Sequence, residues 1–400
     1  MQTYDFDRIR DRRHTSSLKW DVADTELPMW VADMDFETAP CIVSALRKRV
    51  EEQIFGYTVI PDRWYESYRE WWGKYHGFDI KKEWLIFTTG VIPAISTAVR
   101  KFTTPAEKVI VQTPVYNVFF NSIVNNGRRV LENPLAYRDG EYTMDMEDLE
   151  RKMRDPLATM LLLCNPQNPA GKIWGADTLK RIGELAKRHH VLVFSDEIHC
   201  DLTAPGCEYV PFASVSDICR DISITAVAPT KAFGIPGIQS AAVIVPEEGL
   251  RQRMDRALNT DEVAEPSAFA AECAVAAFSD EGREWLMQLR EYIEGNKRLA
   301  VAYINEKLPK IKCVKQDATY LMWLDMNEYT DDSGSLAKFI RSKTGLYLSS
   351  GSIYRGNGSG FLRMNVACPR SLVEDGLRRL YDALNGYCLD SVYEKGSEAS

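Results

Sequence analysis

Short apolar runs separated by amphipathic segments dominate the middle of the chain. Six runs have the length and composition of buried β-strands: residues 84–88, 108–112, 158–164, 191–195, 222–227 and 240–245. Between several of them lie segments of helical periodicity, such as residues 176–190. Strands that alternate with helices favour a mostly parallel sheet with helices on both faces. The pattern therefore predicts an α/β fold.

A different pattern begins near residue 279. A long helical pattern over 279–308 is followed by short apolar runs at 321–324 and 361–365 and by helical patterns at 335–344 and 370–385. This succession predicts a smaller α+β domain at the C-terminus. We expect three parts: an N-terminal segment, 1–45, packed with the small domain, a large domain, 46–285, and the small domain, 286–400.

Polar residues stand where two of the predicted strands end. The run 191–195 ends in Asp196, Glu197 and His199, and the run 158–164 breaks into a loop that contains Asn168. The carboxyl ends of strands in an open α/β sheet line the crevice in which such proteins bind ligands. These side chains are therefore candidates for a binding site.

A lysine and a candidate anion site follow two further predicted strands. Lys231 follows the run 222–227 within a turn of small and hydroxyl residues, and Gly90 follows the run 84–88 and opens a helical pattern. The free N–H groups and the positive dipole end of such a helix suit a phosphate.

Each of these residues has a structural explanation when taken singly. Asp196 could be a helix cap, Asn168 a turn residue, Gly90 a hinge and His199 a satisfied polar residue at the edge of a core. Taken together, they supply what pyridoxal 5′-phosphate (PLP) requires. The cofactor needs a Schiff-base lysine, a carboxylate at its pyridine nitrogen, a hydrogen-bond donor at its phenolic oxygen and an anion site for its phosphate.

Four motifs carry a family resemblance across nearly the whole chain: LPMWVADMDF at 27–36, GVIPAIS at 90–96, DEIHCDL at 196–202 and FLRMNVACPR at 361–370. The chain resembles the fold-type I, class I/II aminotransferase superfamily of PLP enzymes. Within it, the chain is most similar to the MalY/PatB family of cystathionine β-lyases (C–S lyases). The resemblance implies a central sheet of the seven-stranded type.

The resemblance also implies roles for site residues. Lys231 resembles the catalytic Schiff-base lysine, Asp196 the partner of the pyridine nitrogen, Asn168 the partner of the phenolic oxygen, and Tyr116 the aromatic that stacks on the ring. The phosphate would be held by Gly90, by the backbone of Val91 and Ile92, by Thr230, and by Tyr57 from the neighbouring subunit of a homodimer. Arg363 resembles the arginine that binds the substrate carboxylate, in agreement with the fit between a guanidinium and a carboxylate. Trp30 and His199 are expected to line the site, with His199 near the cofactor and no chemical step assigned to either.

The chain departs from the superfamily pattern at the phosphate end. Many aminotransferases carry an arginine seven or eight residues after the lysine, where this chain has Ile238 and Gln239. Ala228 stands where a serine is common. We therefore expect the phosphate to be held mainly by helix dipole and hydroxyl groups.

The activity implied by the resemblance is α,β-elimination from S-substituted cysteines. L-cystathionine would give homocysteine as the thiol, pyruvate and ammonia, a step in methionine biosynthesis, and cystine or other S-substituted cysteines could follow the same route. Two alternatives stay open: a PLP-dependent aminotransferase, and an additional non-catalytic role in which the protein binds and restrains a transcription activator.

Composition narrows the remaining possibilities. The 400 residues carry a net charge of −8 and no long basic run, which argues against nucleic-acid binding. Nine cysteines show no metal-ligand spacing and no disulfide framework, so we expect no metal site and a reducing compartment. No window has the length of a membrane span and the first residues are polar, which predicts a soluble, cytoplasmic protein.

The glycine-rich loop 351–360 lacks the context of a nucleotide-binding motif, so we expect a flexible turn there.

Overall fold

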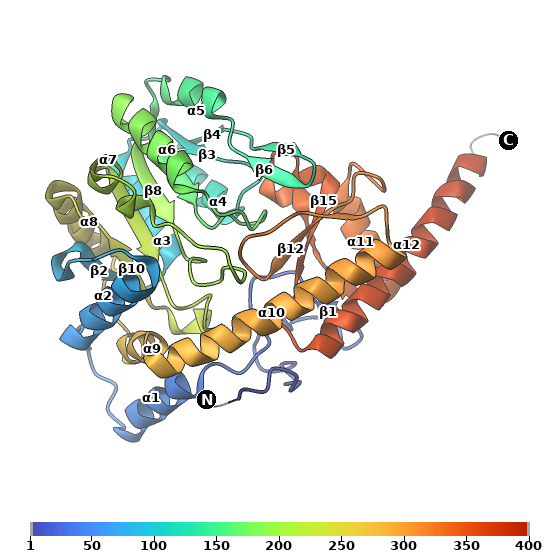
Figure 1. Ribbon diagram of the computed structural model, residues 1–400, viewed down its shortest axis with the longest axis horizontal. Helices are drawn as coiled ribbons and strands as arrows, with labels where there is room; N and C mark the ends of the chain where they lie inside the picture. The colour runs from blue at the N-terminus through green and yellow to red at the C-terminus, as the bar shows by residue number, and fades with distance from the viewer. Residues whose placement is uncertain (1–2, 398–400) are drawn as a thin grey trace.

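A seven-stranded sheet forms the centre of the larger part of the molecule in the computed structural model, which describes residues 3–397 (Figure 1). The strand order is β2 (Leu85–Thr88), β10 (Ala241–Ile244), β9 (Ser223–Val227), β8 (Leu192–Asp196), β7 (Ala158–Cys164), β3 (Lys108–Val111) and β4 (Arg129–Glu132). Within this sheet β10 pairs antiparallel with both neighbours, and the other pairs are parallel. The predicted α/β fold is confirmed.

Burial explains which strands the sequence revealed. All five residues of β9 are buried, as expected for a strand covered on both faces. The six predicted strands are present, with ends that differ from the predicted ones by at most two residues. The seventh, β4, was not predicted because it lies at the edge of the sheet, begins with an exposed Arg129 and has no fully buried residue.

Helices cover both faces of the sheet because successive side chains of a strand point to opposite faces. Met160 and Leu162 of β7 pack in one core cluster with α3 (Val91–Phe102), α4 (Val118–Val124) and α8 (Glu248–Thr260). Leu161 and Leu163 pack in another with α5 (Met146–Met153) and α6 (Ala176–Arg188). A third cluster joins the β2 and β10 side to helices α1 (Pro40–Glu51), α2 (Asp62–His76) and α9 (Ala270–Ala277).

A smaller antiparallel sheet lies beside the large one. Its order is β11 (Lys312–Cys313), β12 (Leu321–Asp325), β15 (Phe361–Asn365) and β14 (Ser349–Ser350). It packs with α10 (Asp280–Lys307), α11 (Ser333–Thr344) and α12 (Arg370–Ser397), and α10 runs from the larger part to the smaller (Figure 1). The α+β character of this region agrees with the sequence pattern, and the domain boundaries at 45 and 285 stay a prediction.

The N-terminal segment is tied to the small sheet region. Strand β1 (Leu27–Pro28) pairs in parallel with β13 (Leu346–Tyr347). Farther along, the buried Asp35 accepts hydrogen bonds from Arg12, Lys19 and Trp20. These contacts bring residues 30–33 to the edge of the cavity described below.

Minor elements complete the described chain: the hairpin β5 (Ala136–Arg138) and β6 (Glu141–Thr143), and the short helix α7 (Asp217–Asp221). The loop 351–360 forms two short 3₁₀ helices, and the expectation of a loose turn is not supported by its packing. A Cβ atom on Gly351 would lie 2.2 Å from the Gly358 carbonyl oxygen, so the two backbones touch. None of the helices in residues 3–397 has the length and apolarity needed to cross a membrane.

Candidate active site

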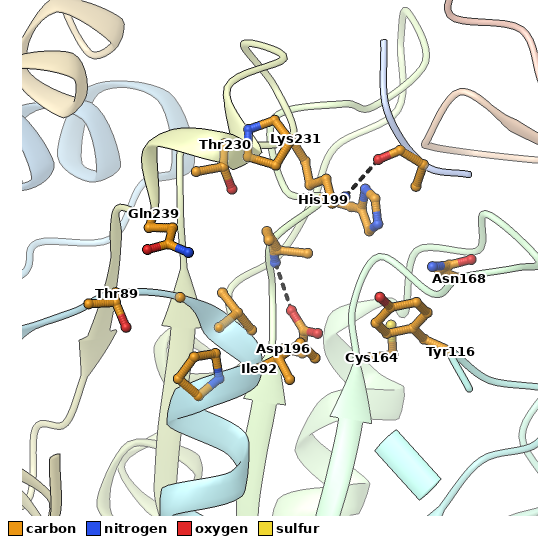
Figure 2. Close-up of a pocket in the computed structure, with 16 residues that line it drawn as sticks. Thr89, Ile92, Tyr116, Cys164, Asn168, Asp196, His199, Thr230, Lys231 and Gln239 are labelled. Atoms are coloured by element: carbon orange, nitrogen blue, oxygen red, sulfur yellow. Dashed lines mark hydrogen bonds between the residues drawn. The ribbon is translucent and has the colours of Figure 1, made fainter. Parts of the chain in front are cut away.

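A cavity of about 280 Å³ opens at the carboxyl ends of β7 and β8 and at the start of α3 (Figure 2). Cys164 and Asp196 are register partners at these strand ends, which places them side by side on its floor. Nine of the residues predicted from the sequence line it: Gly90, Val91, Ile92, Tyr116, Asn168, Asp196, His199, Thr230 and Lys231. The fold thus gathers residues from five separate segments.

Asp196 is the buried acid of the cavity. Its side chain is shielded from solvent, and its Oδ1 accepts a hydrogen bond of 3.1 Å from the Ile198 amide. Burial raises the pKa of Asp196 to about 7, against the opposing effects of that amide and of Lys231. A cationic nitrogen placed at this carboxylate would favour its charged form.

Lys231 reaches into the cavity from the turn after β9 (Figure 2). Its Nζ donates a hydrogen bond of 2.7 Å to the carbonyl oxygen of Ala32 in the N-terminal segment. Burial lowers the pKa of Lys231 to about 8, with Asp33 opposing the shift and Arg363 adding to it. A substantial fraction of the amine is therefore neutral, and nucleophilic, near neutral pH.

Arg363, on β15, approaches the cavity from the small sheet. Its Nη1 donates to Oδ1 of Asn168 at 3.0 Å and its Nη2 donates to the carbonyl oxygen of Trp30 at 2.9 Å. Arg363 and Asn168 are both buried. Arg363 does not itself line the cavity. It holds Asn168, which is one of the cavity-lining residues.

The start of α3 lines the cavity and could hold an anion. No side chain caps this helix, so its first N–H groups are available to a ligand. The absence of a Cβ at Gly90 matters because such an atom would lie only 3.1 Å from Cδ of Pro93. Thr230 and Thr89 line this region together with Gln239, one of the two positions at which the resemblance led us to expect an arginine.

His199 is buried, with 3% of its surface exposed, and its Nδ1 has no hydrogen-bond partner among the described residues. Burial, together with the positive charges of the nearby Lys231 and Arg363, lowers the pKa of His199 to about 3. The imidazole is therefore neutral at physiological pH. Its edge-to-face contact is with Tyr320, at 6.5 Å between ring centroids.

Besides Arg363, two predicted site residues lie outside the cavity of a single chain: Trp30 and Tyr57. Trp30 stacks on Tyr347 with ring centroids 5.1 Å apart and contributes its carbonyl oxygen to Arg363. Tyr57 is fully exposed and does not line the cavity. Their roles stay predictions.

The cavity also contains residues that the sequence did not single out as binding residues. These are Ala32, Thr89, Pro93, Cys164, Ile198 and Pro236, and Gln239, which was noted as a departure. Ala32 contributes its backbone carbonyl oxygen. Every residue type has this atom, so the sequence could not indicate its role. The position of Cys164 and Ile198 at strand ends is the signal that could have indicated them.

Known proteins match nearly the whole length of the chain. Residues 27–380 match the aminotransferase class I and II family. The chain is 42% identical to cystathionine beta-lyase PatB of Bacillus subtilis, over 95% of this chain and 100% of that protein.

Two solved structures superpose on nearly the whole chain. One is the PLP-bound putative aminotransferase from Clostridium difficile, with 39% identity and a TM-score of 0.92, covering 95% of this chain and 100% of the other. The second is the PLP-bound C-S lyase from Staphylococcus hominis, with 30% identity and a TM-score of 0.90, covering 96% of this chain and 98% of the other.

Proposed function

The chain belongs to the aminotransferase class I and II family, and on that premise we propose that it is a PLP-dependent carbon–sulfur β-lyase. One observation carries the proposal. The cavity places the lysine, the acid, the amide and the helix N-terminus that PLP requires in a chain 42% identical to a protein named cystathionine beta-lyase.

The residues of the cavity fit the cofactor group by group. Asp196 would hold the pyridine nitrogen, Asn168 the phenolic oxygen and Lys231 the aldehyde carbon. The phosphate would lie at the uncapped start of α3, with Thr230 and Gln239 beside it. His199 would line the cofactor site as a neutral group.

The bound cofactor supplies an electron-withdrawing ring that takes up the negative charge left when an amino acid loses its Cα proton. Lys231, with a pKa of about 8, accepts that proton at Nζ. Asp196 would keep the ring nitrogen protonated from its buried position. Tyr116 would cover the ring and exclude water, and Arg363 would orient the substrate through its carboxylate.

The net reaction consumes one S-substituted cysteine and one water and releases a thiol, pyruvate and ammonia. The Cβ–S bond breaks, the sulfur leaves with the bonding electron pair, and a proton completes the thiol. L-cystathionine gives homocysteine by this route, which would place the enzyme in methionine biosynthesis. Cystine and other S-substituted cysteines satisfy the same chemistry.

An aminotransferase is the alternative function, and the name of the Clostridium difficile structure favours it for that protein. The experiment that separates the two measures pyruvate and free thiol from L-cystathionine with and without an added keto acid. Production that is independent of the keto acid supports the lyase. Amino-group exchange that requires the keto acid, without thiol release, would overturn the proposal.

Assembly into a homodimer is part of the proposal. The segment around Tyr57 exposes four large apolar or aromatic side chains: Ile54 at 73%, Phe55 at 55%, Tyr57 at 103% and Val59 at 82%. An exposed apolar segment of this kind suits a subunit interface. A second copy would cover it and deliver Tyr57 to the neighbouring phosphate site, which Tyr57→Phe should weaken without changing the mass measured by sedimentation.

We also propose a cytoplasmic location, supported by the eight cysteines whose side chains the structure describes, all of which are free. A separate role in restraining a transcription activator is the third candidate. It predicts that the inactive Lys231→Ala variant keeps the effect on the activator, and loss of that effect together with catalysis would argue against it.

A further inference from the structure

A second cluster of chemically active side chains lies at the end of α2, outside the cavity that holds Lys231. His76, Cys200 and Asp201 each place one potential ligand atom within 4.8 Å of the others. His76 and Asp201 are 125 positions apart in the sequence, so no spacing motif reveals the cluster. The fold alone brings these residues together.

Asp201 is the centre of the cluster and is held in a fixed orientation. Its Oδ1 lies 2.9 Å from Nε2 of His76 and accepts a hydrogen bond, also 2.9 Å, from Nε1 of Trp71. The thiol of Cys200 lies 3.8 Å from Oδ2. Asp201 and Cys200 are buried, and the side chain of His76 is 8% exposed. A carboxylate anchored by a tryptophan N–H has the outer support that metal-ligating carboxylates usually have.

A cavity of about 310 Å³ gives access to the cluster from outside. His76 and Cys200 line it, together with Tyr75, Gly77, Thr203, Cys207, Glu208 and Tyr209. An ion held by three protein atoms at its inner wall would keep one coordination position open toward this cavity.

We propose that His76, Cys200 and Asp201 form a binding site for a divalent transition metal, with Zn²⁺ the ion that best matches the ligands. One nitrogen, one sulfur and one oxygen donor suit Zn²⁺, whereas Mg²⁺ and Ca²⁺ take oxygen ligands. The ion replaces the contact between His76 and Asp201, and the Cys200 thiol releases its proton to water in the cavity and binds the ion as a thiolate. Water from the cavity fills the fourth position.

The site has a structural consequence. Cys200 and Asp201 lie in the turn that follows Asp196, closed by hydrogen bonds from the Cys200 amide to Glu197 and from the Leu202 amide to His199. A metal bound here links that turn to α2 and so stiffens the segment that carries Asp196 and His199. The inference is independent of the reaction proposed above.

Titration of the full-length protein with Co²⁺, followed by difference absorption spectroscopy, tests the site. Cobalt in a tetrahedral site with a thiolate ligand gives visible bands and a sulfur-to-cobalt charge-transfer band. We expect both to saturate at one Co²⁺ per chain and to disappear when one equivalent of Zn²⁺ is added. Zn²⁺ should also raise the Tm of the wild type.

Variants identify the ligands. Cys200→Ala should abolish the charge-transfer band and weaken binding by at least about tenfold, and it should lose the rise in Tm. The matched control Cys219→Ala removes another buried thiol and should leave the spectrum unchanged. Cys200→Ser tests the same point if the alanine variant does not fold. Absence of both bands in the wild type, or an undiminished charge-transfer band without Cys200, would overturn the proposal.

Discussion

Nη1 of Arg363 donates a hydrogen bond of 3.0 Å to Oδ1 of Asn168, which joins the two parts of the molecule across the cavity. Arg363 belongs to the small sheet, whereas Asn168 follows β7 of the large one. The bond fixes which end of the Asn168 amide faces inward, since the oxygen is occupied and the N–H₂ group is left to donate. Substrate binding at Arg363 is thereby connected to the residue expected to contact the cofactor.

Replacing Arg363 by lysine should reduce kcat/KM by about 100-fold, mainly through KM, because lysine cannot form two parallel bonds to a carboxylate. A loss of about 3 kcal/mol in charge-assisted hydrogen bonding corresponds to that factor. Arg355→Lys is the matched control, since Arg355 is partly exposed and pairs with Glu132 at 3.2 Å. Steady-state kinetics of both variants check the prediction, and equal losses in the two would contradict it.

Cofactor attachment should occur at Lys231 and not at Lys297, a second lysine whose pKa is lowered by burial. Burial lowers the pKa of Lys297 to about 8 as well, so reactivity alone does not separate the two amines. Lys297 lies in α10, outside the cavity that contains Asp196. Borohydride reduction of the PLP-loaded protein followed by peptide mass spectrometry should find the label on the Lys231 peptide, unchanged in Lys297→Ala. A label on the Lys297 peptide would show that the cavity is not the cofactor site.

Asp196 should destabilise the cofactor-free protein by an amount that grows as the pH rises from about 4 to 7. Burial raises the pKa of Asp196 from 3.8 to about 7, so the unfolded chain ionises first and folding must take up a proton in this window. Asp196→Asn removes this cost, which is on the order of a few kcal/mol. Cofactor-free Asp196→Asn should therefore have a higher Tm than the wild type at pH 8 and a similar Tm at pH 4. A lower Tm at pH 8 would contradict the account, as would activity retained in the loaded variant.

Asp35 should be important for folding although it does not touch the cavity. Its Oδ2 lies 2.7 Å from Nζ of Lys19, which is 1% exposed, and its Oδ1 accepts from Arg12 and Trp20. Asp35→Asn leaves a buried lysine without its counter-charge and should lower the free energy of unfolding by about 3–5 kcal/mol. Urea denaturation measures the change. Asp62→Asn, which removes an exposed partner of Lys82, should change stability by less than about 1 kcal/mol.

The strands that the sequence predicts are those whose side chains are buried on both faces. An apolar run such as residues 158–164 carries its own signal, and β7 has the predicted bounds. Strand β4 carries no such signal because an edge strand with exposed residues resembles a loop in composition. The short strands β1, β13 and β14 depend on pairing partners distant in the sequence, which a local pattern does not contain.

In the candidate site, too, some features could be predicted from the sequence and others could not. Lys231, Asp196 and Asn168 could be found because polar residues at strand ends are few and each has a distinct chemistry. The contact of Lys231 with the Ala32 carbonyl could not be found from the sequence, because backbone atoms are the same in every residue. The cluster of His76 with Asp201 likewise depends on the packing of α2 against the turn after β8.

The measurement that tests the central claim most directly follows the products of L-cystathionine with PLP-loaded protein and no keto acid. Lys231 and Asp196 in one cavity predict homocysteine and pyruvate in equal amounts, with kcat about 10²–10⁴-fold lower in Lys231→Ala. Pyruvate production of the same size in that variant, or no thiol from the wild type, would contradict the account.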